Sequence, residues 1–214
     1  MNTNRNLFIR LLCYFGGMLI MTFGVAVSVK ADLGVTPLSS IPYTITVITG
    51  MDLGIATILF SVFMVFLQML LLRKDFKLAN LLQIPVGIIF GMFMSAACKS
   101  MDFFPDPSAF RLRFLIMLIS TVIVAVGVFL YVPSGFITLP PDAFMVVVSQ
   151  VTKKNFSTVK VICDVTMVTI SLISCLAAIH SLGSVGVGTV AAALLVGLEV
   201  KGLTKIFREQ HFGT

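Results

Sequence analysis

Charged side chains are scarce in this chain, because Asp, Glu, Lys and Arg together make up only 11% of its 214 residues. Soluble domains carry about 25% charged residues. Hydrophobic residues make up 58% and the mean hydropathy is +1.08, which is more apolar surface than a water-soluble core of this length needs. The composition excludes an ordinary soluble domain and predicts a protein embedded in the lipid bilayer.

Motifs for catalysis and metal binding are also missing. The four cysteines form no C-x-x-C pair, and the two histidines, His180 and His211, lie far apart in the sequence. No phosphate-binding glycine loop, H-E-x-x-H sequence or Ser-His-Asp order occurs. We therefore expect no disulfide framework, no metal site, no cofactor and no enzyme activity.

Six apolar runs are long enough to cross a bilayer as helices of about 20 residues. They cover residues 7–29, 54–72, 80–98, 112–132, 157–178 and 184–203. The first run is too long for a signal-peptide core and lacks a small-residue cleavage site, so we expect it to be retained as a span. The predicted fold class is an all-α polytopic membrane protein with a single transmembrane domain over residues 1–214.

Two shorter apolar runs, 37–49 and 140–152, are left over. At 1.5 Å per residue a helix of this length covers about 20 Å, too little for a hydrocarbon layer of about 30 Å. Each run begins with a proline, Pro37 or Pro140, which suits the first turn of a helix. These runs predict two short helices that are either re-entrant or lie in the interface.

Matching residues recur about a hundred positions apart. At a spacing of 103 the pairs are Arg10 and Arg113, Gly24 and Gly127, Pro37 and Pro140, and Thr49 and Thr152. Each half would contain three spans, and duplicated halves with an odd number of spans must lie in opposite orientations, as in many secondary transporters. We predict two inverted three-helix repeats, residues 1–104 and 105–214, each with one short helix.

Lysine and arginine are concentrated at one set of helix ends. With the N-terminus inside, ten lie on the cytoplasmic side and four outside, the ten being Arg5, Arg10, Arg73, Lys74, Lys77, Lys153, Lys154, Lys201, Lys205 and Arg208. Positive residues favour the cytoplasmic side. We therefore expect a multi-pass protein with both termini in the cytoplasm. The net charge of +6 marks that face and implies no nucleic-acid partner.

Ionisable residues inside apolar helices are costly and mark candidate functional sites. Lys160 and Asp164 lie four residues apart on the fifth span, so they share a helix face and can form an ion pair. The pair either holds a substrate or proton, or is structural, with Lys160 reaching the cytoplasmic surface. Asp142 follows Pro140 by two residues, where a carboxylate is favoured by the helix dipole, and either caps the short helix or joins the site.

Other polar residues complete the predicted substrate site. Thr36 precedes the first short helix, whose polar stripe begins with Ser39 and Ser40 and either lines a cavity or faces headgroups. Gln83 interrupts the third span together with Pro85, and Thr189 lies in the glycine-rich start of the sixth. The small residues Gly87, Gly91 and Ser95 form a ridge that allows close helix packing, within one subunit or across a homodimer.

The G-V-T-P segment at Gly34–Pro37 and the T-G-x-x-x-G-x-A-T run at Thr49–Thr57 resemble the bacterial membrane family called YitT/YczE-like. The glycine-rich stretch Gly186–Gly197 is similar as well. The resemblance implies a transporter-like protein of the bacterial inner membrane.

The leading hypothesis is a secondary transporter or facilitator for a small polar solute, with an anion as one candidate. The solute would bind near the bilayer midplane between the two short helices. If the proline ends point inward, two helix N-termini favour an anion; the opposite direction favours a cation. The alternatives are a non-transporting membrane accessory or scaffold protein, and a channel.

Overall fold

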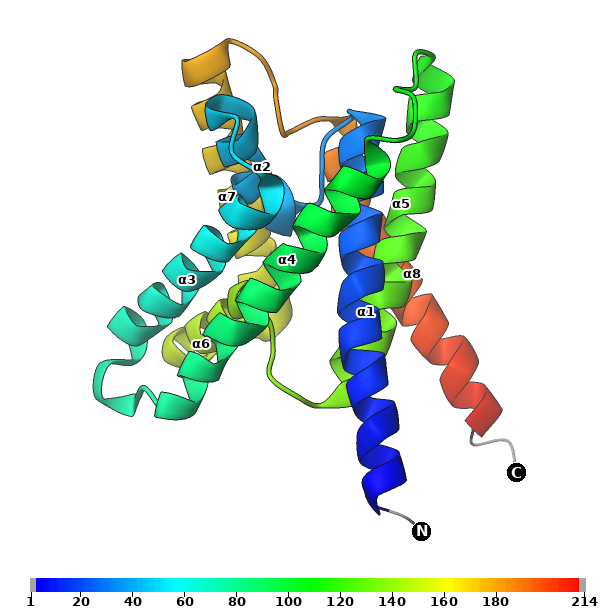
Figure 1. The fold of residues 1–214 in the computed structure, drawn as a ribbon. Helices are drawn as coiled ribbons and strands as arrows, with labels where there is room; N and C mark the ends of the chain where they lie inside the picture. The colour runs from blue at the N-terminus through cyan, green and yellow to red at the C-terminus, as the bar shows by residue number, and fades with distance from the viewer. Residues whose placement is uncertain (1–2, 212–214) are drawn as a thin grey trace. The chain divides into compact units, whose positions relative to one another are not determined.

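The computed structural model describes residues 3–211, and the side chains of residues 7–206. Over that range the chain forms eight α-helices and no strand (Figure 1). They are α1 (Thr3–Ala31), α2 (Pro37–Thr49), α3 (Leu53–Leu72), α4 (Gln83–Met101), α5 (Phe110–Tyr131), α6 (Pro140–Thr152), α7 (Phe156–Ile179) and α8 (Val187–His211). Short 3-10 helices cover Arg73–Asp75, Leu78–Leu82 and Val132–Ser134. The side chains of Arg5 and Arg208, two of the predicted cytoplasmic cations, lie outside the described residues.

Six helical segments are long and apolar enough to cross a membrane: Leu7–Ala31, Leu53–Asp75, Leu78–Met101, Phe110–Ser134, Phe156–Ile179 and Val187–Ile206. The predicted all-α fold with six spans is confirmed. The two short runs also form helices, and α2 and α6 have the predicted bounds, 37–49 and 140–152. Their length of 13 residues leaves them too short to span.

The start of the third span differs from the prediction. Leu78–Leu82 form a 3-10 helix, and α4 begins at Gln83. Gln83 and Pro85 therefore open the helix instead of interrupting it, and in a first turn the missing N–H of Pro85 costs no helical hydrogen bond. The sixth span likewise begins at Val187, three residues later than predicted, because Gly183 turns the chain with φ +52.

The local backbone conformation repeats along the chain. Helices α2 and α6 begin and end 103 positions apart, and so do the first residues of α3 and α7. Gly50 and Lys153 share that spacing, and both have positive φ, 73 and 54. Asp52 and Asn155 share it too, and each is the N-cap of the following helix. Two segments of different sequence thus have the same order of helix, left-handed residue and cap.

The helices form two compact units, and each unit takes helices from both halves of the sequence. Unit 1 comprises Met1–Thr36, Ala97–Phe136 and Val187–Thr214; unit 2 comprises Pro37–Ala96 and Ile137–Gly186. Unit 1 therefore contains α1, α5 and α8. Unit 2 contains α2, α3, α6, α7 and most of α4.

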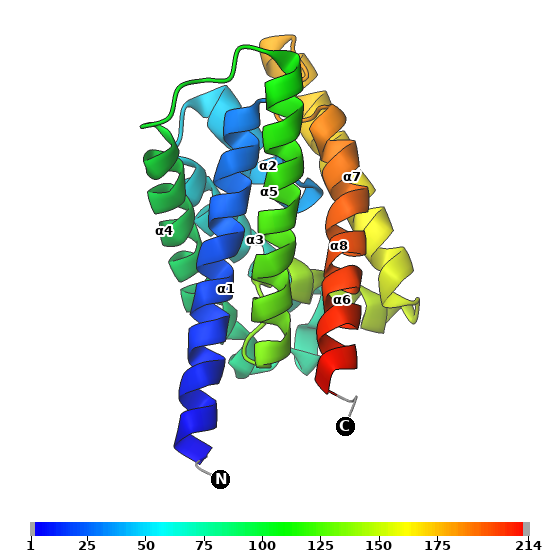
Figure 2. The same cartoon turned by 90° about the vertical axis from the view of Figure 1, so that its right-hand side faces the viewer.

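In unit 1, α1 and α5 are antiparallel and pack along their length, while α8 packs on α5 (Figures 1 and 2). The beginning of α1 and the end of α8 lie at the same end of this unit. Arg10 near the start of α1 donates from Nε to the carbonyl oxygen of Ser134 at 2.9 Å. Arg113 near the start of α5 pairs with Asp32, just past the end of α1, at 3.1 Å. Each arginine thus reaches the segment that ends the other helix.

The α1–α5 crossing depends on glycine. A Cβ on Gly24 would lie 3.1 Å from the carbonyl oxygen of Ser120, and a Cβ on Gly127 would lie 2.7 Å from that of Gly17. Ser120 and Gly127 follow Gly17 and Gly24 by 103 positions. The same contact is therefore made twice, with the roles of the two helices exchanged.

An exposed ion pair links the end of α1 to the segment between α4 and α5. Lys30 Nζ lies 2.6 Å from Asp106 Oδ1. Hydrogen bonding to Lys30 and its positive charge lower the pKa of the Asp106 carboxyl. Since Asp106 is well exposed to solvent, this pair contributes little to stability.

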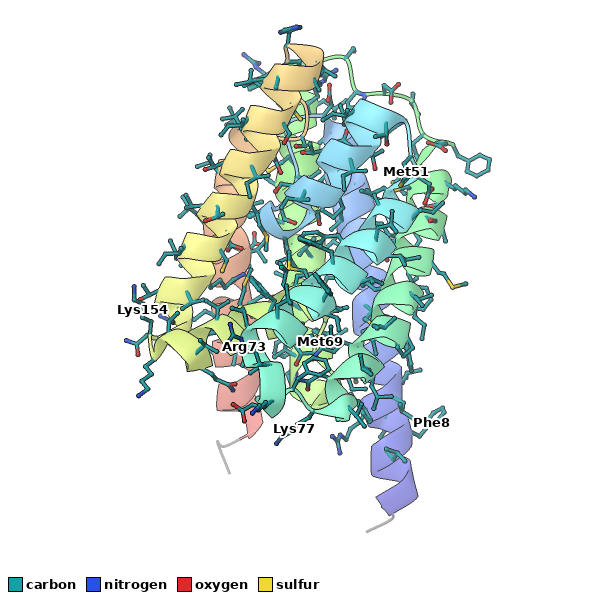
Figure 3. The ribbon with its side chains drawn as sticks, turned by 90° about the vertical axis from the view of Figure 1, so that its left-hand side faces the viewer. Phe8, Met51, Met69, Arg73, Lys77 and Lys154 are labelled. Carbon is teal, nitrogen blue, oxygen red and sulfur yellow. The ribbon has the colours of Figure 1, made fainter. Side chains whose placement is uncertain are left out.

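In unit 2 both short helices pack against the same two long ones. Helix α2 contacts α7 and α3, and α6 contacts α3 and α7. Their shared core contains Phe60, Met64, Met145, Val159 and Met167. Figure 3 shows Arg73, Lys77 and Lys154 toward one end of this unit and Met51 toward the other, as expected if the basic residues mark one membrane face.

The small-residue ridge on α4 packs inside the chain, against α3. A Cβ on Gly87 would lie 2.7 Å from Ser61 Cβ, and one on Gly91 would lie 2.6 Å from the carbonyl oxygen of Gly54. Ser95 Oγ donates to Asp52, the N-cap of α3. The sequence predicted that the ridge packs either within one subunit or across a homodimer. In the structure it packs within one subunit.

Candidate functional site

Two glutamines hold the start of α6 in unit 2. Gln68 on α3 donates from Nε2 to Gln83 Oε1 at 2.9 Å and to the carbonyl oxygen of Pro140 at 3.2 Å. Gln83 Nε2 donates back to Gln68 Oε1 at 3.2 Å. Both side chains are buried, Gln68 completely. In an apolar environment such groups need hydrogen-bond partners, and Gln83, predicted to bind substrate, has Gln68 as its partner, which in turn bonds α6.

Gly87 also lies beside the start of α6. A Cβ on Gly87 would lie 3.4 Å from Pro140 Cγ as well as against Ser61. The proline end of α6 is buried, whereas Thr152 and the residues after it are exposed. Helix α2 follows the same pattern, because Pro37 is buried and Thr49 is exposed. In both short helices the N-terminal end lies in the protein and the C-terminal end at its surface.

Three charged side chains lie near the start of α6. Lys160 Nζ is 3.3 Å from Asp164 Oδ2, and the side chains are 44% and 19% exposed. Asp142 is close enough to interact electrostatically with both. Asp164 Oδ1 is buried and has no hydrogen-bond partner. The cluster holds two carboxylates and one ammonium, so its net charge is negative when all three are ionised.

The first turn of α6 explains why Asp142 is not a hydrogen-bonding cap. No side chain caps this helix, since Pro140 and Pro141 have no N–H to satisfy. The N–H of Ala143 already donates to the carbonyl oxygen of Leu139 at 2.9 Å. At most one N–H of this turn, that of Asp142, is left for an anion. The start of α6 is therefore a poor anion site, although the helix dipole still favours the Asp142 carboxylate.

The polar stripe of α2 is largely bonded within the protein. Ser40 is completely buried and donates to the carbonyl oxygen of Pro37 at 2.7 Å. Ser39 is half-buried. Thr44 Oγ1 lies 2.5 Å from Ser184 Oγ and lines a cavity between α2 and α7. The sequence left open whether this stripe lines a cavity or faces headgroups, and Thr44 lines a cavity.

The predicted site residues divide between the two units. Thr36 and Thr189 belong to unit 1, whereas Ser39, Ser40, Gln83, Asp142, Lys160 and Asp164 belong to unit 2. Thr36 is half-buried and Thr189 is 1% exposed. Among them the structure pairs Lys160 with Asp164, Asp142 lies within electrostatic range of both, and Gln83 joins Gln68 beside Pro140.

Sequence reasoning missed two polar residues inside spans, Gln68 and Glu199. Glu199 on α8 lies in unit 1, where its Oε1 is 3.0 Å from the hydroxyl of Thr121. Its Oε2 is buried without a hydrogen-bond partner. The rule that selected Asp164, an ionisable residue within an apolar run, also applies to Glu199. The rule does not select Gln68, because its side chain is neutral. Its role is visible only from the residues that it contacts in the structure.

A family model described as a family of unknown function, DUF6198, matches residues 8–205. The chain belongs to the DUF6198 family. It is also similar to the "Uncharacterized membrane protein YczE" of Bacillus subtilis (strain 168), at 26% identity over 199 residues, which cover 91% of this chain and 85% of that protein. No solved structure matches the chain. The YczE-like resemblance predicted from the sequence motifs is confirmed, and the DUF6198 match includes part or all of each of the long helices.

Proposed function

We propose that this DUF6198 protein is a secondary transporter or facilitator that moves a small polar solute across the bacterial inner membrane. The observation that carries the proposal is the reciprocal contact of α1 and α5, in which Gly24 meets Ser120 as Gly127 meets Gly17. When residue i of one element contacts residue j of the other and the equivalent of i contacts the equivalent of j, the two elements are related by a two-fold axis. Because the two helices are antiparallel, such an axis would lie in the membrane plane, which supports the proposal that residues 1–104 and 105–214 are inverted repeats.

The packing in unit 2 supports the same symmetry. Helix α2 packs on α7 as α6 packs on α3, and α2 packs on α3 as α6 packs on α7. With α2 equivalent to α6 and α3 to α7, each contact has its counterpart. Transporters built from inverted repeats bind their substrates at interrupted or short helices near the midplane. On this reading α2 and α6 are re-entrant, since their proline ends are buried and their other ends exposed.

We place the solute at the Asp142, Lys160 and Asp164 cluster beside the start of α6. Two carboxylates facing one ammonium favour a solute with a positive group over the anion that the sequence suggested. The buried, unpartnered Oδ1 of Asp164 supports this assignment, because a polar atom without a partner in an apolar surrounding is stabilised by a bound donor. The solute is then cationic or zwitterionic and small.

Uptake into proteoliposomes tests this function. Purified protein is expected to take up at least one solute from a set of amino acids and polyamines with saturable kinetics. Asp142→Asn should reduce uptake at low solute concentration about tenfold or more, the effect of losing one charged hydrogen bond of about 1.5–3 kcal/mol. Thr169→Val, an exposed position on α7, is the control. Linear flux would indicate a channel, and no flux with a stoichiometric co-purifying protein would indicate an accessory protein.

We further infer that the basic ends of the spans face the cytoplasm. Cysteines introduced at Lys99 and Ser108 should react with a membrane-impermeant maleimide in intact cells, and one at Lys77 only after permeabilisation. Lys77 directly precedes the Leu78–Met101 span and Lys99 lies in its last turn, so labelling them from the same side is impossible if this segment crosses the membrane. Labelling of Lys77 from outside would reverse the proposed orientation.

A further inference from the structure

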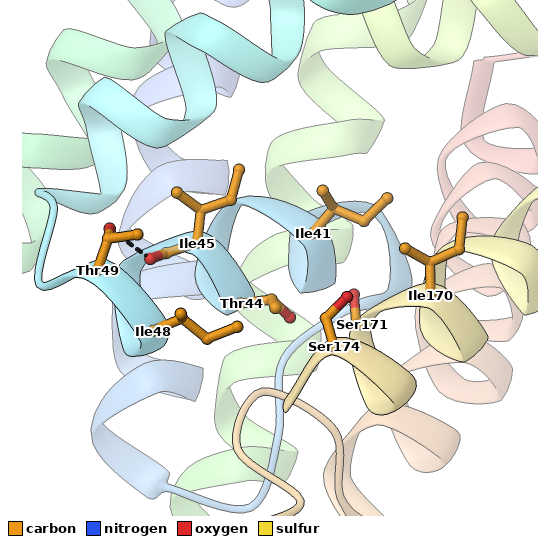
Figure 4. Close-up of a pocket in the computed structure, with 8 residues that line it drawn as sticks. All are labelled: Ile41, Thr44, Ile45, Ile48, Thr49, Ile170, Ser171 and Ser174. Atoms are coloured by element: carbon orange, nitrogen blue, oxygen red, sulfur yellow. Dashed lines mark hydrogen bonds between the residues drawn. The ribbon is translucent and has the colours of Figure 1, made fainter. Parts of the chain in front are cut away.

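The cavity that Thr44 lines lies between α2 and α7, within unit 2. It has a volume of about 200 Å³ and is lined by four isoleucines and four hydroxyl side chains: Ile41, Ile45, Ile48, Ile170, Thr44, Thr49, Ser171 and Ser174. Figure 4 shows Ile41, Ile45 and Ile48 along α2, with Ile41 nearest to Ile170, and Thr44, Ser171 and Ser174 grouped together. No charged residue lines it. The cavity therefore suits a neutral molecule that is largely aliphatic.

The hydroxyl of Ser171 has no hydrogen-bond partner, although the residue is 0% exposed. Hydroxyls inside helices usually satisfy themselves by bonding to the carbonyl one turn earlier. Thr166 and Thr169 on the same helix do so, each at 2.7 Å. Ser171 differs from Thr166 and Thr169 in lacking such a bond, and it lines the cavity, so its hydroxyl is available to a molecule bound there.

Two of the other hydroxyls that line the cavity, those of Thr44 and Thr49, are already engaged. Thr44 Oγ1 lies 2.5 Å from Ser184 Oγ, and Cys175 Sγ lies 3.7 Å from both oxygens. Thr49 donates to the carbonyl oxygen of Ile45 at 2.7 Å. Ser174 is half-buried, so Ser171 is the fully buried lining hydroxyl that needs a partner, and a hydroxyl can supply either a donor or an acceptor.

The cavity is separate from the charged cluster and opens at an apolar surface. Ser171 follows Asp164 by seven residues, which places it two turns away, about 10 Å along α7. Ile170 is 49% exposed and Ile48 is 37% exposed at the edge of the cavity. Because Ile170 lies within the Phe156–Ile179 span, this opening is at membrane depth. A bound molecule would enter from the lipid phase.

We propose that this cavity is a binding site for a neutral aliphatic amphiphile whose single hydrogen-bonding group contacts Ser171. The isoleucines hold the aliphatic part, and the absence of charged side chains excludes an ionised head group, which would be costly to bury unpaired. The group that meets Ser171 can belong to a free aliphatic alcohol or to the ester region of a membrane lipid. The site does not depend on the proposed transport function.

Photolabelling of the purified protein in phospholipid nanodiscs tests the site. One probe is an octanol that carries a diazirine, and the other is a phosphatidylethanolamine with a diazirine in its acyl chain. We expect saturable labelling of residues 41–49 and 170–174, displaced by excess unlabelled octanol. Labelling there by the octanol probe indicates a free amphiphile; labelling by the phospholipid probe alone indicates a lipid chain. Labelling that is unsaturable and spread over all helices would overturn the proposal.

Two variants and one control connect the labelling to the proposed contacts. In Ser171→Ala, the concentration of unlabelled octanol needed to displace the probe should rise about fivefold, the effect of losing one neutral hydrogen bond. Ile45→Trp should fill the cavity and abolish labelling of it. Thr169→Val, which removes a self-bonded hydroxyl of α7, should label as the unsubstituted protein does. Ser171→Ala is a small change that should leave the fold intact, so it still tests the site if Ile45→Trp fails to fold. An unchanged affinity of Ser171→Ala for octanol would contradict the assignment to Ser171.

Discussion

Asp164→Asn is expected to abolish solute uptake and to destabilise the folded protein, because it leaves Lys160 without its 3.3 Å partner. Breaking a buried ion pair by removing one member costs about 3–5 kcal/mol. Lys160 is 44% exposed, so part of this cost is relieved by solvent or headgroups, and we expect about 2 kcal/mol. Thermal unfolding in detergent measures the stability, and proteoliposome uptake measures the activity.

The double variant Lys160→Met with Asp164→Leu separates structure from function. Removing both charges leaves no stranded group, so stability should return to near that of the unsubstituted protein while uptake remains absent. Asp75→Asn, at an exposed carboxylate of unit 2, is the control and should change neither quantity. Full uptake by the double variant would show that the pair is structural, and the proposed solute site would then be wrong.

Gly17→Ala should destabilise the protein by about 1–3 kcal/mol, the usual cost of overpacking a close contact. A Cβ on Gly17 would lie 2.7 Å from the backbone nitrogen of Tyr131 and 2.8 Å from the carbonyl oxygen of Gly127. Both neighbours are backbone atoms, so relief requires α1 and α5 to move apart. The midpoint of thermal unfolding is the measurement.

Neighbouring and reciprocal positions provide the controls for this contact. Gly16 has nothing within 4 Å of its Cβ position, so Gly16→Ala should be neutral or stabilise α1 by up to about 1 kcal/mol through helix propensity. Gly127→Ala should match Gly17→Ala, since it meets the carbonyl oxygen of Gly17 at 2.7 Å. The two effects should not add in the double variant, because one separation of the helices relieves both. Equal stability of Gly16→Ala and Gly17→Ala would contradict the α1–α5 packing.

Much of the secondary structure was readable from the chain. Six spans follow from apolar length, because a helix that buries its backbone polar groups must cover the hydrocarbon layer. The bounds of α2 and α6 follow from Pro37 and Pro140 and from the short length of the apolar runs that they open. The 103-residue spacing of matching residues also recurs in the backbone, at Gly50 and Lys153. All of these signals are local or periodic along the sequence.

The chemistry of the site depended on partners that no local pattern reveals. Lys160 and Asp164 could be paired from the sequence because one helical turn brings them together. The pairing of Gln68 with Gln83 and Pro140, the hydrogen bond of Thr121 with Glu199 and the cavity around Ser171 join different helices. Hydrophobic length places a helix in the membrane without specifying which face meets which neighbour. That choice is made by close approach at small residues and by the need of each buried polar group for a partner.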